Sequence, residues 1–129
     1  MIIRRESSSG LLQLEATSAT LRRVAMAIEA GAGLLESDPT PVVDGFDEVI
    51  HGLRIRSNPT HKVIVEAGDG DGLTISGDRE SRSLFATNLR KLADGQLSDH
   101  IHVEYFPTHF VLAPTSAPLI VVLASAQSG

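Results

Sequence analysis

Residues 63–95 read VIVEAGDGDGLTISGDRESRSLFATNLRKLADG, and this stretch decides the fold class. Apolar and polar residues alternate on either side of a Gly/Asp-rich run at residues 68–72, as they do in β-strands. Glycine and aspartate accept positive φ at low cost, so the run predicts a tight turn within a β-hairpin. Asp78 then offers a helix N-cap, and apolar residues recur at helical spacing until Gly95. A hairpin followed by an amphipathic helix indicates an α+β chain.

The two sides of this predicted helix differ in polarity. Its apolar side is formed by Leu84, Phe85, Leu89 and Leu92, with Ala86 and Asn88 at the margins. Its charged side chains are predicted to point outward: Arg79, Glu80, Arg82, Arg90 and Lys91. A helix of this kind packs its apolar side on a sheet and leaves the other side to water.

A similar strand-and-helix pattern occurs near the beginning of the chain. Residues 11–16 alternate in polarity, and Thr17 and Ser18 can each cap a helix that Gly31 and Gly33 end. The two strand-to-helix units are similar in pattern, which is consistent with an internal duplication.

The remaining chain supplies more strands. We predict them at residues 49–56, 61–67, 100–106 and 119–123, the last being apolar enough for a central strand. Residues 32–46 are predicted to be a connector, and the polar residues 1–10 a flexible end. The predicted α+β fold is a two-layer sandwich: two helices on one face of a mostly antiparallel sheet of six or seven strands.

Length and composition limit the class of protein. The 129 residues favour a single domain over residues 1–129, and 42% of them are apolar, enough for an aliphatic core. The chain has no cysteine, which excludes disulfides and thiolate metal sites, and its net charge of −5 argues against nucleic-acid binding. We see no secretion signal and no apolar run near the ~20 residues of a membrane helix. We therefore expect a cytoplasmic protein that does not bind membranes.

Motifs of catalysis and cofactor binding do not occur in the sequence. There is no nucleophile elbow, no Walker loop and no Gly-x-Gly-x-x-Gly pattern. The glycines of residues 68–72 precede a strand, so they cannot form a phosphate cradle at a helix N-terminus. We therefore predict a non-enzymatic binding protein without a cofactor.

One segment has residue types that could carry chemistry. His100, His102 and Glu104 alternate along a predicted strand, so they leave one face of it, and His109 follows a turn. These four side chains could bind a divalent metal or act as a general base. The same face could equally contact a protein or simply face water. The first of these interpretations defines an alternative function, a metal-dependent enzyme or a small-ligand-binding domain.

Several stretches of the second half resemble a known family. They are residues 73–78, the helix from Leu84 to Leu92, the string His-Val-Glu-Tyr-Phe-Pro-Thr-His at residues 102–109, and residues 112–120. Together they are similar to immunity protein 32 of bacterial polymorphic toxin systems, a resemblance that extends over roughly residues 47–123.

The resemblance implies a small α+β protein that binds and neutralises a cognate toxin domain. Charged and aromatic side chains near the string of residues 102–109 are candidate partner contacts: His102, Glu104, Tyr105, Phe106, His109 and Phe110. If the toxin is basic, Asp94, Asp99 and Glu104 could steer its association. A homodimer formed through an exposed strand edge is a further expectation.

Overall fold

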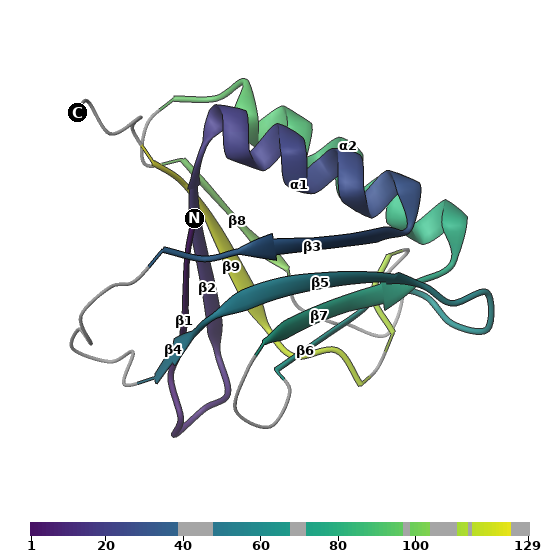
Figure 1. Cartoon of the computed structure of the whole chain (residues 1–129), viewed down its shortest axis with the longest axis horizontal. Helices are drawn as coiled ribbons and strands as arrows, with labels where there is room; N and C mark the ends of the chain where they lie inside the picture. The colour runs from purple at the N-terminus through teal and green to yellow at the C-terminus, as the bar shows by residue number, and fades with distance from the viewer. Residues whose placement is uncertain (39–47, 68–71, 97–98, 104–110, 114, 125–129) are drawn as a thin grey trace.

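The computed structural model describes residues 1–38, 48–67, 72–96, 99–103, 111–113 and 115–124 (Figure 1). These residues form two helices, α1 (Ser18–Ala30) and α2 (Arg79–Ala93). They also form nine strands: β1 (Ile2–Arg5), β2 (Leu12–Thr17), β3 (Ala32–Glu36), β4 (Glu48–Ile50), β5 (Gly52–Ser57), β6 (Ile64–Ala67), β7 (Leu73–Gly77), β8 (His100–Val103) and β9 (Leu119–Ala124). The predicted α+β class is confirmed.

The strands form two sheets rather than the one that we predicted. A five-stranded sheet has the order β4-β1-β2-β9-β8, and a four-stranded sheet has the order β3-β5-β7-β6. Each sheet contains one parallel pair, β2 with β9 and β5 with β7, and its other pairs are antiparallel. The strands of the two sheets run in different directions in Figure 1. The predicted mainly antiparallel pairing is therefore correct, while the number of strands was underestimated.

The two helices lie side by side on the same side of the molecule (Figure 1). Their apolar sides join the inward-facing side chains of both sheets in one aliphatic cluster. Largest among the fully buried members are Ile3, Leu12, Leu21, Ile28, Leu53, Leu73, Ile75, Leu89, Leu112 and Leu119. An ion pair at the helix surface, Arg90 to Glu29 at 2.5 Å, lowers the pKa of the Glu29 carboxyl through the hydrogen bond from the guanidinium.

The two halves of the chain repeat one arrangement. The antiparallel pair β1–β2 leads into α1, and β3 with β5 follows; the antiparallel pair β6–β7 leads into α2, and β8 with β9 follows. Each half gives its last two strands to the sheet of the other half, since β5 pairs with β7 and β9 with β2. The buried positions of α1 have counterparts in α2: Leu21 and Arg82, Val24 and Phe85, Ala25 and Ala86, Ile28 and Leu89. The similar patterns of the two units therefore fold into the same structure.

Two segments that we predicted to be irregular form strands. Residues 2–5, which we expected to belong to a flexible end, form β1 between β2 and β4, with Ile3 fully buried. Residues 32–36, which we assigned to a connector, form β3 against β5. The rest of that predicted connector is described only at residues 37–38. Both strands are short, and neither has the regular alternation on which the prediction relied.

Arg82 is the largest exception to the predicted polarity of α2. It was expected to face solvent, but only 4% of it is exposed. Its Nε donates to the Gly77 carbonyl at 2.9 Å, and its Nη1 donates to the carbonyls of Ile28 and Glu29 at 2.8 and 3.0 Å. Its Nη2 reaches the Ser57 hydroxyl at 3.3 Å. The guanidinium thus joins the end of α1 to the ends of β5 and β7.

The position of this guanidinium also explains the glycine that ends α1. The last turn of α1 contains no basic residue, so Arg82 supplies the positive charge that stabilises a helix C-terminus. Gly31 caps the helix with φ of 79°, in the left-handed region that favours glycine. A Cβ atom at Gly31 would lie 2.6 Å from Nη1 of Arg82. Glycine is therefore required here both by the backbone and by the close approach.

Candidate functional site

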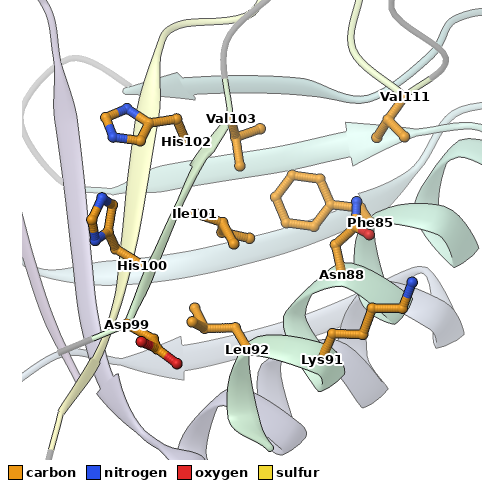
Figure 2. Close-up of a pocket in the computed structure, with 10 residues that line it drawn as sticks. All are labelled: Phe85, Asn88, Lys91, Leu92, Asp99, His100, Ile101, His102, Val103 and Val111. Atoms are coloured by element: carbon orange, nitrogen blue, oxygen red, sulfur yellow. The ribbon is translucent and has the colours of Figure 1, made fainter. Parts of the chain in front are cut away.

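A groove lies between α2 and β8. It encloses about 650 Å³, within the range of small-molecule and peptide sites. Figure 2 shows the side chains that line it: Phe85, Asn88, Lys91, Leu92, Asp99, His100, Ile101, His102, Val103 and Val111. The α2–β8 groove denotes this set of ten residues.

The floor of the α2–β8 groove is apolar. Phe85 and Leu92 point from α2 toward β8, and Ile101 and Val103 point back from the strand (Figure 2). Val103 is buried and Ile101 half-buried, as expected for the inward-facing positions of a strand that alternates. The groove therefore offers an aliphatic and aromatic surface that an apolar side chain of a ligand can contact.

Polar groups surround this floor. Asn88 and Lys91 lie on the exposed side of α2, where neither makes a hydrogen bond or ion pair with the residues that the structure describes. Asp99 is already engaged, because its Oδ2 accepts the N–H of Gln96 at 2.7 Å. The groups left free to meet a ligand at the helix side are thus an amide and an ammonium.

β8 is an edge strand in the described part of the structure. It pairs with β9 on one side only, with Ile101 opposite Val121. Immediately before β8, the N–H of Leu123 donates to the carbonyl of Asp99 at 2.8 Å. Because hydrogen-bonded pairs alternate along an antiparallel ladder, Ile101 and Val103 bond to β9. The backbone N–H and C=O groups of His100 and His102 therefore point away from β9, toward the free edge.

The side chains of His100 and His102 share one face, as predicted. Both are exposed and lie on the opposite side of the strand from Ile101 and Val103 (Figure 2). Their ring centroids are 5.2 Å apart in an edge-to-face arrangement. The other five candidate contact residues lie outside the described residues: Glu104, Tyr105, Phe106, His109 and Phe110. Glu104 and His109 are also two members of the predicted metal set. Within the described ranges, no three metal-ligating side chains converge.

The sequence does not indicate the helix side of the groove. Phe85 and Leu92 are buried, as predicted for the apolar side of α2, with Asn88 at its margin, and nothing local shows that they also line a hollow beside β8. Asp94 and Asp99, which we considered for steering a basic toxin, are both exposed; Asp94 pairs with Arg22, and Asp99 accepts from Gln96. The only usable signal in the sequence was the polar Asn88 on the border of an apolar helix face.

Comparison with known proteins supports the resemblance over part of the chain. Residues 72–124 match the model of the family immunity protein 32. No curated protein and no solved structure matches the chain. The matched range contains β7, α2, β8 and β9, and so all ten residues of the α2–β8 groove. Neither described helix is long and apolar enough to cross a membrane.

Proposed function

We propose that this chain is a non-enzymatic protein that binds and neutralises a cognate bacterial toxin domain in the cytoplasm of the producing cell, and that the α2–β8 groove is its contact surface. The observation that carries the proposal is the match to immunity protein 32, because the matched residues 72–124 include every side chain of the groove. The match supports the proposed class of protein, and the groove is the surface that we assign to the contact.

The physical character of the groove supports this role. Protein interfaces combine an apolar centre that excludes water with a polar rim that gives specificity. Phe85, Leu92, Ile101 and Val103 form such a centre, and Asn88, Lys91 and the edge of β8 form the rim. Hydrogen bonds hold the scaffold beneath it together, because Arg82 links α2 to the end of α1 and to the ends of β5 and β7. A preformed surface of this kind binds without a large ordering cost.

The direct test is to express the chain with the product of the gene beside it. We expect the two proteins to copurify as a stable complex and the toxic activity of the partner to be lost. Failure of the neighbouring product to bind or be inhibited would contradict the proposal.

A charge reversal at the rim examines the contact surface. Lys91→Glu is expected to weaken toxin binding by about tenfold through repulsion and a lost favourable contact. Arg79→Glu is the matched control, because Arg79 is exposed on the same helix but does not line the groove. Equal affinity of the two variants for the toxin domain, measured by calorimetry, would remove the groove from the interface.

The size of the groove and the free imidazoles favour a second candidate, a metal-dependent or small-ligand-binding domain that uses His100, His102, Glu104 and His109. A bound ion would stabilise the folded state in proportion to its concentration over its Kd. Metal content of the purified protein and its melting temperature with and without chelator test this function. Absence of metal together with an unchanged melting temperature would exclude the metal-dependent form.

A further inference from the structure

The free edge of β8 offers hydrogen bonds that the described fold does not use. The N–H and C=O groups of His100 and His102 point away from β9, as the bond from Leu123 to Asp99 establishes. The edge of β6 differs, because there Val63 exchanges bonds with the carbonyl of Val111 and the N–H of Ala113, both at 2.8 Å. An unpaired strand edge is a template for another strand.

A strand added to β8 would meet different surroundings on its two faces. Side chains on one face would enter the α2–β8 groove, where Phe85 and Leu92 oppose Ile101. Side chains on the other face would lie beside the exposed rings of His100 and His102, because cross-strand neighbours stand about 5 Å apart. The site therefore favours a segment whose residues alternate between two chemistries.

The hydrogen-bond donors on the second face identify its chemistry. At the groove, Lys91 makes no ion pair with the described residues, and Asp99 accepts the N–H of Gln96 but keeps its negative charge, so the two charges offset each other there. On the opposite face, the exposed imidazoles of His100 and His102 each carry an N–H donor. That face therefore presents donors, and these match carboxylates.

From these observations we propose that the partner inserts an extended segment as an additional strand on β8, with apolar residues in the α2–β8 groove and aspartate or glutamate residues beside His100 and His102. The proposal rests on the proposed function and specifies its mode of contact. Main-chain hydrogen bonds hold the segment, and the groove together with the imidazole donors selects the side chains.

A synthetic peptide can probe this mode of binding without the toxin. We would use a peptide of about eight residues that alternates valine and glutamate, a common strand length, and compare it with one that alternates valine and lysine. Amide hydrogen exchange of the labelled protein is measured with each peptide. The valine–glutamate peptide should slow exchange at His100 and His102 by about tenfold or more, since strand pairing protects these amides. Unchanged exchange, or equal protection by both peptides, overturns the proposal.

Variants at one position separate the backbone from the side chain. His102→Pro removes an N–H that faces the free edge and leaves the ladder to β9 intact, so it should weaken binding of the valine–glutamate peptide by about tenfold. His102→Ala keeps that N–H and should weaken binding by only about threefold. Equal losses of peptide affinity in the two variants would contradict an added strand. If His102→Pro does not fold, the exchange data on the unchanged protein still test the proposal.

The same exchange measurement with the toxin domain distinguishes this inference from the proposed function. If the toxin binds and is inhibited but protects amides elsewhere, the added strand is wrong and the proposed function survives. If the toxin does not bind while the valine–glutamate peptide protects His100 and His102, the proposed function fails and the edge remains a strand-binding site. Protection that rises with protein concentration alone would identify a second copy of this chain as the occupant and overturn the proposal.

Discussion

The two halves of the molecule share one arrangement, but they differ where the helix faces its edge strand, since a groove lies between α2 and β8 in the second half. In the first half, β3 lies directly against α1, and a Cβ atom at Gly33 would approach the Cβ of Ala27 to 2.9 Å. Gly33 pairs with Ile55 of β5, and Ile101 pairs with Val121 of β9. Because β3 and β5 correspond to β8 and β9, Gly33 and Ile101 are counterparts. The second half thus has isoleucine where the first has glycine.

The difference lies in the size of a few facing side chains. On the helix, Ala27 and Asn88 are counterparts, because Ile28 and Leu89 follow them at matching buried positions. Ala27 and Gly33 are small and let β3 lie against α1, whereas the second half has the larger Asn88 and Ile101 at these positions, beside a groove of about 650 Å³. One scaffold therefore packs closely in one half and leaves a groove in the other, at the surface that we propose for binding.

Arg82 allows the largest test of this comparison, because its counterpart in α1 is the fully buried Leu21. Arg82→Leu makes the two halves alike, and it removes the guanidinium bonds to four oxygens. The carbonyls of Ile28 and Gly77 keep the N–H groups of Gly31 and Asn58 as donors. We expect the free energy of unfolding to fall by about 3 kcal/mol, since a hydrogen bond to a charged group contributes about 1.5–3 kcal/mol. Urea unfolding measures the change.

The control for this substitution is Arg79→Leu on the exposed side of α2, which should change the free energy of unfolding by less than about 0.5 kcal/mol. A small effect of Arg82→Leu would mean that water or a rearranged chain satisfies these carbonyls. The stability of the second half would then not depend on the buried guanidinium of Arg82.

An intermediate effect is expected when the same large side chain is placed in both halves. Ala27→Phe must separate β3 from α1, so it should destabilise the protein by about 1–3 kcal/mol, as overpacking does. Asn88→Phe places the same ring at the counterpart position, where the groove has room, and should cost less than about 0.5 kcal/mol. Thermal unfolding of both variants decides whether the groove is open in solution. Equal destabilisation would show that it is closed.

Much of the fold could be predicted from the sequence because its signals are local. The hairpin and helix of residues 63–95 have strong periodicity, and the caps Thr17 and Asp78 lie where their residue types indicated. β3 contains Gly33 beside the end of a helix, so it looked like a connector, although pairing with β5 overrides that weak local preference. Whether a segment of this length forms a strand depends more on the strands that it pairs with than on its own sequence.

The site depended on contacts between distant segments, which single-sequence patterns do not contain. The face shared by His100 and His102 followed from simple alternation. The groove itself required that side chains of α2 and β8 line one hollow. The burial of Arg82 required acceptors on α1, β5 and β7. These are long-range properties, and they are also the ones that distinguish the two halves.

The smallest expected effect concerns the two helix N-caps, which have nearly the same backbone geometry but different chemistry. Asp78 has φ and ψ of −71° and 164°, and Thr17 has −69° and 163°. Each accepts the N–H of the third residue along, Ser81 at 2.7 Å and Thr20 at 3.3 Å. The hydrogen bond from the Ser81 backbone lowers the pKa of the Asp78 carboxyl, with smaller contributions from the charges of Arg82 and His61.

Only the cap of α2 should therefore respond to acid. Because the pKa of Asp78 is lower in the folded than in the unfolded chain, its stabilisation is complete above about pH 4, the ordinary pKa of aspartate, and is lost as the pH falls through the folded pKa. Asp78→Thr should change the free energy of unfolding by less than about 0.5 kcal/mol at pH 7, because threonine also caps, and should flatten its decline in acid. Thr17→Asp should steepen that decline, since it gives the first half the titrating cap of the second. Urea unfolding from pH 7 to about pH 3 measures both slopes, and unchanged acid sensitivity in both variants would mean that other carboxylates dominate.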